Sequence, residues 1–345
     1  MPYVNNYISI LNEMNISFIL FNWDRFHIEK EENAITFRDN KVGHKRGPLE
    51  YFRYKSFIIK KCKEHHIDKV IVFGIQLAFF LESFLLKNFR GNYILDIRDY
   101  NNILKYFTIN KLVKNSSFTV ISSPEYKKFL PTSGNYIINH NTHIFSKHIL
   151  ENREVSFNNK KIRISNIGAI RDLDANVQFI KSIKNNSKFE IYFHGEGIIN
   201  DKVYSFIKTE GIDNVFLSGR YLRSEEEKLY LKSDLINIIQ NSNGINNKTL
   251  LPNRLYSSVI YKKPVITLNG SYLADIIKEY KLGIVLESFE SIEEKIDKYF
   301  SSFNKIEYET GVNLFIERVI MENLHFKRKL CDFFKEDMYL ESTLK

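Results

Sequence analysis

The clearest secondary-structure pattern in this chain lies in residues 251–286, LPNRLYSSVIYKKPVITLNGSYLADIIKEYKLGIVL. Its apolar residues recur with a helical period over Arg254–Tyr261 and again over Leu273–Tyr280. The short apolar runs Val265–Leu268 and Ile284–Leu286 are typical of buried strands. The stretch therefore predicts helix, strand, helix and strand in succession, which is the alternation of a parallel α/β sheet.

Residues at the ends of these segments support the same boundaries. Pro252 and Asn253 are residue types that begin helices. Ser271 follows an Asn-Gly turn and can cap the second helix, and Gly283 follows the basic end of that helix.

The same alternation occurs in both halves of the 345-residue chain. The strands predicted in the first half are Ile16–Trp23, Lys69–Phe73, Tyr93–Ile97, Ser117–Ile121 and Tyr136–Ile138. Those predicted between residue 150 and the opening stretch are Lys161–Ile167, Phe189–Phe193, Val215–Leu217 and Leu235–Ile239. Residues 27–50 have no clear period and are predicted to form a charged loop, whereas Asn313–Phe334 can form one long helix.

Composition indicates a globular protein with anionic partners. Hydrophobic residues make up 43% and charged residues 26%, the net charge is +9, and the pI is near 9.1. The sequence has no zinc-type cysteine pair and no RNP-like aromatic motif, so we expect no nucleic-acid partner.

The chain is expected to be cytoplasmic. Its two cysteines, Cys62 and Cys331, are far apart in sequence, as suits a reduced compartment. The first residues show no signal-peptide pattern, and the most apolar stretch, Val70–Leu86, is interrupted by polar residues.

The segment from Asn253 to Leu286 resembles the nucleotide-sugar-binding segment of GT-B glycosyltransferases, closest to the family 4 type of capsule, exopolysaccharide and O-antigen clusters. The resemblance rests on an Asn-Arg pair that opens a helix, a Lys-Pro about ten residues later, a small-residue turn, and a final glycine with an aliphatic strand. The alternative is an ordinary βαβ unit, which also gives helix, Lys-Pro, strand and glycine.

The resemblance implies two Rossmann-like parallel-sheet domains facing a cleft, with a final helix that crosses back to the first domain. We expect an acceptor-side domain at 1–150, a nucleotide-sugar domain at 151–312, and the crossing helix at 313–345. Two segments resemble parts of the first domain: residues 93–101 (YILDIRDYN) and 136–141 (YIINHN). Two others resemble parts of the second domain: residues 193–197 (FHGEG) and 215–221 (VFLSGRY). The chain departs from the GT-B plan because it opens at the first helix, so the first strand is expected to be missing.

Several residues of the second half are candidates for binding the donor. A departing nucleotide diphosphate gains negative charge, which cations and backbone N–H groups stabilise. By resemblance, Arg171 and Arg254 contact the diphosphate. Glycines at strand ends permit close backbone approach, and Ser271 can present a helix N-terminus to phosphate. The predicted donor-binding residues are Gly168, Arg171, Gly195, Gly197, Arg220, Lys228, Asn253, Arg254, Ser257 and Ser271. For each cation the alternative is a solvated surface charge.

Family 4 enzymes typically carry two glutamates eight positions apart near this segment, and the second of them grips the ribose. The corresponding positions here are Thr249 and Ser257. Serine can still form hydrogen bonds, but the bidentate carboxylate grip is lost.

Candidates for the acceptor side follow strand ends in the first half. Asp99 and His140 are the predicted catalytic residues, with Asp99 positioned to orient an acceptor hydroxyl or act as a base. Asp96, Arg98 and Asn141 are predicted to bind the acceptor, and Arg98 can hold its phosphate. The alternatives are an Asp–Arg pair that holds the loop, and a structural histidine. No cluster has metal-ligand spacing, so no metal is expected.

These features predict a metal-independent glycosyltransferase that retains anomeric configuration. The favoured donor is a UDP-sugar, and no further cofactor is expected. The sugar would be transferred to a lipid-linked saccharide acceptor in surface polysaccharide assembly. The basic and aromatic segment 45–55 suggests a peripheral position on the anionic inner face of the plasma membrane. The alternatives are a GT-B epimerase, or a degenerate GT-B module that binds a partner transferase or glycan without catalysis.

Overall fold

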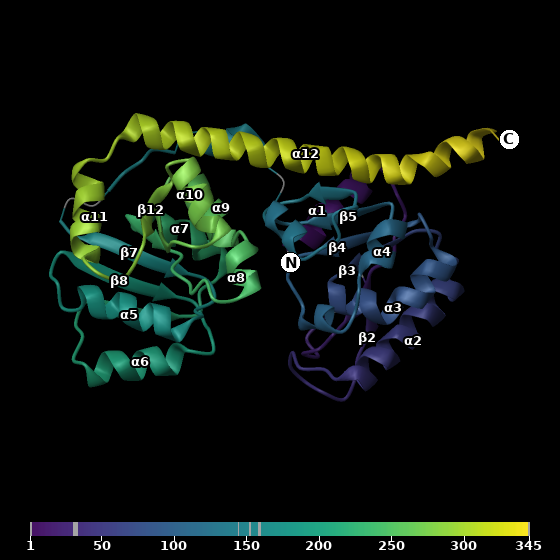
Figure 1. Ribbon diagram of the computed structural model, residues 1–345, viewed down its shortest axis with the longest axis horizontal. Helices are drawn as coiled ribbons and strands as arrows, with labels where there is room; N and C mark the ends of the chain where they lie inside the picture. The colour runs from purple at the N-terminus through teal and green to yellow at the C-terminus, as the bar shows by residue number, and fades with distance from the viewer. Residues whose placement is uncertain (1, 30–33, 144, 152, 158–159, 344–345) are drawn as a thin grey trace. The chain divides into compact units, whose positions relative to one another are not determined.

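The computed structural model describes residues 2–29, 34–143, 145–151, 153–157 and 160–343. The chain divides into two compact units (Figure 1). Unit 1 contains residues up to His143 and those from Glu322 onward, and unit 2 contains Ile144–Met321. The sequence had placed the corresponding boundaries at 150 and 313.

Unit 2 is built on a six-stranded parallel sheet in the order β12-β11-β10-β7-β8-β9. Its strands are β7 (Ile162–Ile167), β8 (Phe189–His194), β9 (Val215–Gly219), β10 (Leu235–Asn237), β11 (Val265–Leu268) and β12 (Gly283–Leu286). The chain first moves outward from β7 to β9 and then returns to the other side of β7 with β10. The order of the strands therefore reverses between β7 and β10, which is where ligands bind in open α/β sheets.

Helices cover both faces of this sheet, with a separate apolar core on each face. The helices of unit 2 are α5 (Leu173–Ile183), α6 (Asn200–Thr209), α7 (Glu226–Lys232), α8 (Ile245–Thr249), α9 (Asn253–Ile260), α10 (Tyr272–Glu279), α11 (Ile292–Ser301) and the first part of α12 (Lys305–Thr343). Residues of α5, α6 and α11 pack into one core. Residues of α7, α9, α10 and α12 pack into the other, and Figure 1 shows these two groups on opposite sides of the strands.

Unit 1 contains a four-stranded parallel sheet in the order β3-β4-β5-β6 and a separate two-stranded parallel sheet. The elements are α1 (Pro2–Glu13), β1 (Phe21–Trp23), β2 (Ile35–Phe37), α2 (Pro48–Glu64), β3 (Val70–Phe73), α3 (Ile75–Asn88), β4 (Tyr93–Ile97), α4 (Asn110–Asn115), β5 (Phe118–Ile121) and β6 (Tyr136–Ile138), with short 3₁₀ turns between them. The last part of α12 completes this unit through contacts such as that of Phe326 with Tyr7 of α1, whose ring centroids are 5.0 Å apart.

The prediction that residues 27–50 lack regular structure is wrong, because β2 lies within them and pairs in parallel with β1. The three residues of β2 are only partly buried. Such a short strand leaves no periodic pattern, and it depends on its partner strand instead.

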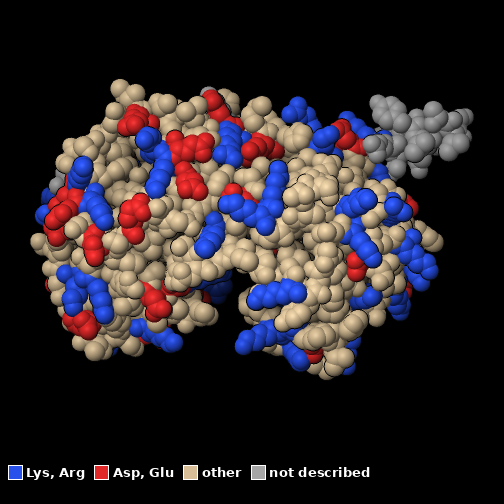
Figure 2. Space-filling model, in the orientation of Figure 1, with Lys and Arg blue, Asp and Glu red and all other residues tan. Residues whose placement is uncertain are grey.

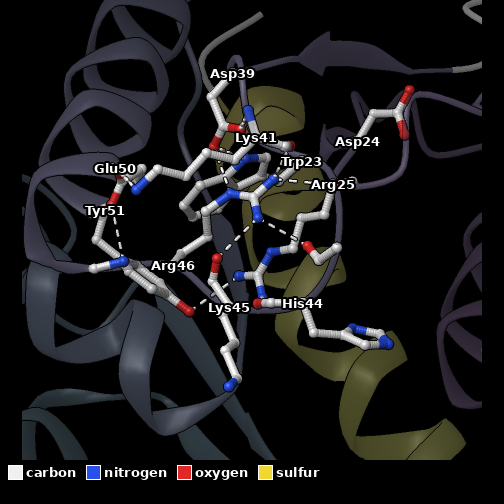
Figure 3. A network of polar contacts seen from close by, with 12 residues as sticks. Trp23, Asp24, Arg25, Asp39, Lys41, His44, Lys45, Arg46, Glu50 and Tyr51 are labelled. Carbon is white, nitrogen blue, oxygen red and sulfur yellow. Dashed lines mark hydrogen bonds and ion pairs between the residues drawn. The ribbon is translucent and has the colours of Figure 1, made fainter.

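Polar contacts around the carboxylate of Asp39 hold this segment in place (Figure 3). Asp39 accepts hydrogen bonds from Trp23 Nε1 at 3.1 Å and from Arg46 Nε at 2.6 Å. The guanidinium of Arg25 lies over the Trp23 ring, 4.5 Å from its centroid, and donates to the Tyr51 hydroxyl at 3.0 Å. Residues 34–50 are thus held by buried side-chain contacts that sequence periodicity does not record.

Candidate functional site

Arg254 lies at the carboxyl ends of β7 and β10, where the strand order reverses. Its Nε donates to the carbonyl oxygen of Ile167 at 2.7 Å, and its two terminal nitrogens donate to Asn237 at 2.9 Å and Ala169 at 3.2 Å. Ile167 and Asn237 are the last residues of β7 and β10. A guanidinium has five N–H donors, so these three bonds leave two for a ligand at the sheet edge.

Arg171 supplies a second positive charge beside Arg254. It is exposed on the loop that joins β7 to α5. Burial lowers the pKa of Arg254, and the charge of Arg171 lowers it further. Arg254 bonds the backbone of Ala169, two residues before Arg171 on the same loop, and two cations at one edge of a sheet favour binding of an anion. The structure thus brings together Arg171 and Arg254, the two residues that the sequence predicted for the diphosphate.

The loop that carries Arg171 is held by Asp172, which begins α5 in a left-handed backbone conformation with φ of 60°. One carboxylate oxygen of Asp172 accepts from the Ala175 backbone N–H at 3.4 Å, and the other accepts from the Asn241 backbone N–H. These bonds join the loop after β7 to the loop after β10, on either side of the strand reversal.

Gly195 and Gly197 allow two loops of the protein to approach each other. A Cβ atom on Gly195 would lie 2.1 Å from the carbonyl oxygen of Gly168, and one on Gly197 would lie 1.9 Å from that of Ile170. The sequence-based interpretation was that these glycines let a nucleotide approach the backbone. In the structure, backbone of the loop after β7 fills the space that a Cβ would take at both glycines, and the approach of a nucleotide to them stays a prediction. Their contribution is to shape that loop.

The other predicted donor-binding residues differ in exposure and contacts. Arg220, Lys228 and Asn253 are exposed. Ser271 caps α10 by accepting a 3.3 Å hydrogen bond from the Ala274 backbone N–H. Gly168 has a φ of 109°, and a Cβ there would lie 3.7 Å from a terminal nitrogen of Arg254. Gly168 therefore lies close to the guanidinium of Arg254.

Sequence reasoning missed one residue near this edge, the carboxylate of Glu226. Its Oε1 accepts a hydrogen bond of 3.4 Å from the hydroxyl of Ser257, which lies on α9 one turn after Arg254. The two residues come from different helices, and no local sequence pattern joins them. Only the folded structure shows that the carboxylate of Glu226 lies next to Ser257.

In unit 1, Asp96 and Arg98 form a buried ion pair at the end of β4. A terminal nitrogen of Arg98 donates to Asp96 Oδ2 at 2.7 Å, and its Nε donates to Oδ1. Arg98 also donates to the side-chain oxygen of Asn139 at 2.7 Å, and Tyr7 donates to Asp96 Oδ2 at 2.7 Å. Because these polar atoms bond one another, the geometry favours the loop-holding alternative over acceptor binding.

His140 is also buried, at 1% exposure. Its Nε2 lies 2.5 Å from an Oε of Glu322, and its backbone N–H donates to Asn323 Oδ1 at 3.0 Å. Both partners belong to α12, so His140 joins the end of β6 to that helix. Asp99 is exposed, and Asn141 is partly buried, with an Oδ1 that has no hydrogen-bond partner among the described residues.

Two further observations concern the described part of the chain. No helix within it is apolar over a length sufficient to cross a bilayer. It also contains no group of three His, Cys, Asp or Glu side chains arranged to hold a metal ion.

Comparison with solved structures identifies the fold. Sucrose-phosphate synthase from Thermosynechococcus elongatus matches 99% of this chain and 91% of its own, with a TM-score of 0.65 and 10% identity. The lipopolysaccharide outer core galactosyltransferase WaaB matches 94% of both chains, with a TM-score of 0.66 and 12% identity. HepE from Anabaena, in complex with UDP and glucose, matches 94% of this chain and 89% of its own, with a TM-score of 0.60 and 11% identity.

No family model matches the sequence, and the search of curated proteins gives no match. At these identities the structural matches establish the fold alone. The predicted fold class is confirmed: the chain has the GT-B fold of glycosyltransferases, with parallel α/β sheets and a C-terminal helix.

Proposed function

We propose that this protein is a glycosyltransferase that transfers a sugar from a nucleotide diphosphate sugar, with UDP as the favoured nucleotide. The proposal rests on one observation: Arg254 and the exposed Arg171 supply two positive charges at the strand reversal of unit 2. An open α/β sheet binds ligands at this position, and two cations there suit a diphosphate. The GT-B fold, shared with a UDP-bound neighbour, supports the same reading.

In the proposed reaction, the bond between the anomeric carbon and the diphosphate oxygen breaks, and an acceptor oxygen bonds to that carbon. The acceptor hydroxyl gives its proton to an oxygen of the departing diphosphate, and the nucleotide diphosphate leaves with the remaining negative charge. Arg171 and Arg254 stabilise that charge without a metal ion. We propose retention at the anomeric carbon, by analogy with the family 4 resemblance.

The proposed acceptor is a lipid-linked saccharide of surface polysaccharide assembly, reached from an anionic membrane surface. Three residues of the segment predicted to face the membrane, Lys45, Phe52 and Arg53, are exposed. Tyr51 and Tyr54 are buried, so they belong to the core of unit 1. On the face shown in Figure 2, Lys and Arg side chains of unit 1 outnumber acidic ones, which suits an anionic surface.

A second candidate function is a GT-B module that binds a partner transferase or a glycan without catalysis. Ser257 and Thr249 favour it, since they stand where the family 4 resemblance expects glutamates. The two candidates differ in whether unit 2 binds a nucleotide diphosphate.

Thermal-shift titration with UDP, GDP, ADP and dTDP tests the proposal. A ligand that binds the native state raises the melting temperature, and we expect a rise of several degrees with UDP near 100 times its Kd. Arg171→Gln should abolish the rise without lowering the melting temperature of the free protein. Arg90→Gln, at an exposed position in unit 1, is the matched control and should leave the rise intact.

Absence of a shift with all four nucleotides in folded protein would overturn the donor site and favour the non-catalytic module. A shift that survives Arg171→Gln unchanged would remove Arg171 from the site.

A further inference from the structure

Three consecutive glutamates at the start of α7 have different surroundings. Glu225 accepts a hydrogen bond from the backbone N–H of Leu222 at 2.7 Å, and Glu227 forms a 3.1 Å ion pair with Arg153. Glu226, between them, turns toward the Ser257 hydroxyl. No lysine or arginine of the described chain forms an ion pair with Glu226, although the residue is partly buried.

Glu226 lies at the same edge of the sheet as Arg254. It is the first residue of α7, a helix that follows β9 and packs against β7, so its N-terminus is at the carboxyl end of the parallel strands. Its partner Ser257 is three residues after Arg254 on α9, and residues at this spacing share a helix face. Burial raises the pKa of the Tyr221 hydroxyl; Glu226 raises it further, and Arg254 lowers it. Both charges therefore act on one side chain.

A partly buried carboxylate is stabilised when hydrogen-bond donors reach it. One long hydroxyl contact leaves most of the acceptor capacity of Glu226 unused. A vicinal diol offers two O–H donors at the spacing of the two carboxylate oxygens. In a nucleoside diphosphate, such a diol is the ribose, and it lies next to the diphosphate.

We infer that Glu226 binds the ribose diol of the nucleotide donor, with Ser257 beside it as a second hydrogen-bonding group. The inference rests on the proposed function, because it places the ribose next to a diphosphate held by Arg171 and Arg254. The carboxylate comes from α7, whereas the family 4 resemblance would place it on α9 at position 257. The residue thus selects ribonucleotides over analogues that lack the diol.

Isothermal titration of three ligands tests this assignment: UDP, 2′,3′-dideoxy-UDP and inorganic pyrophosphate. Wild-type protein should bind dideoxy-UDP about 10- to 100-fold more weakly than UDP, the range for hydrogen bonds to a charged group. Glu226→Gln should weaken UDP binding by a similar factor and no longer distinguish the two nucleotides. Binding of pyrophosphate should be unchanged, because it has no diol.

Glu227→Gln is the matched control, since it removes the adjacent carboxylate and should keep both UDP affinity and discrimination. The double variant Glu226→Gln, Ser257→Glu places a carboxylate at this position again, now from α9 instead of α7. If this variant again binds UDP more tightly than dideoxy-UDP, the result supports the assignment.

The outcomes separate the inference from the proposed function. Wild-type protein that binds UDP and dideoxy-UDP equally well would overturn the role of the diol without needing any variant. A folded Glu226→Gln variant that still discriminates would overturn the role of Glu226 alone. Failure of wild-type protein to bind UDP, GDP, ADP or dTDP would overturn both the inference and the donor site. If GDP or ADP binds in place of UDP, the same comparison uses that nucleotide and its dideoxy analogue. Binding of dTDP alone, whose deoxyribose has no vicinal diol, would overturn the role of the diol.

Discussion

Arg254 donates a 2.9 Å hydrogen bond to the backbone oxygen of Asn237, the residue at which β10 ends. Together with its bonds to Ile167 and Ala169, this contact joins two loops that follow neighbouring strands. Arg254 therefore shapes the sheet edge as well as supplying charge to it. An experiment on this residue must measure stability alongside binding.

We predict that Arg254→Lys lowers the free energy of unfolding by about 1–3 kcal/mol, because one ammonium cannot reach three carbonyl oxygens and the partly buried oxygens of Ile167 and Asn237 lose their donors. UDP affinity should fall as well, since the loop carrying Arg171 loses its support. Urea denaturation and isothermal titration measure the two effects. Arg220→Lys, at an exposed position, should change stability by less than about 0.5 kcal/mol. Equal stability of the two variants would show that the carbonyl contacts of Arg254 contribute little.

The ion pair of Asp96 and Arg98 leads to a second prediction. Arg98→Ala should lower the free energy of unfolding by about 3–5 kcal/mol, since it leaves the carboxylate of Asp96 buried without its cation. Asp99→Asn, one residue further on the same loop and exposed, is the control and should cost about 0.5 kcal/mol or less. Urea denaturation measures both. If Arg98→Ala folded stably and lost only transfer to an acceptor, Arg98 would be an acceptor-binding residue after all.

Sequence pattern predicted the elements of the opening stretch within one residue. Helix α9 was expected at 254–261 and lies at 253–260, and β11 lies at the predicted residues 265–268. These elements are set by local signals: apolar periodicity, a proline, and a glycine after a helix. The two residues predicted for the diphosphate, Arg171 and Arg254, also come together, because both follow strand ends at the same edge.

Contacts between distant residues could not be predicted in this way. Arg254 and Ile167 are 87 residues apart, and Glu226 and Ser257 are 31 apart. At Gly195 and Gly197, for example, the atom nearest to an added Cβ is a backbone oxygen of another loop, a contact that no sequence pattern shows. A glycine indicates that something lies close to the backbone, and only the fold identifies what that is.

The close approach at Gly197 gives a third prediction. Gly197→Ala places a Cβ 1.9 Å from the carbonyl oxygen of Ile170, so the loop after β7 must shift. We expect a loss of about 1–3 kcal/mol in the free energy of unfolding and weaker UDP binding, because Arg171 follows Ile170 directly. Gly244→Ala is the control, since its Cβ would meet no atom within 4 Å. Thermal melts with and without UDP compare the variants, and indistinguishable melting curves would contradict the role assigned to Gly197.

Asp24, in unit 1, leads to a prediction about pH. Burial alone would raise the pKa of its carboxyl, but hydrogen bonds from Arg38 and from the backbone N–H groups of Ile28, Glu29 and Phe26 lower the pKa to about 2. An unfolded aspartate has a pKa near 3.9. The native state therefore binds this proton less readily than the unfolded state does. The resulting stability is fully present above about pH 4 and is lost as the pH falls toward 2.

Asp24→Asn removes the charge and keeps the shape of the side chain, so we predict a melting temperature lower than that of wild type by a few degrees at pH 7. The difference should shrink as the pH falls from 4 to 2, because wild-type Asp24 then becomes protonated as well. Melting curves at half-unit pH steps measure the difference, with Glu29→Gln as a control at an exposed acidic side chain. A difference that stays constant down to pH 2 would mean that the contacts of Asp24 depend on shape and not on charge.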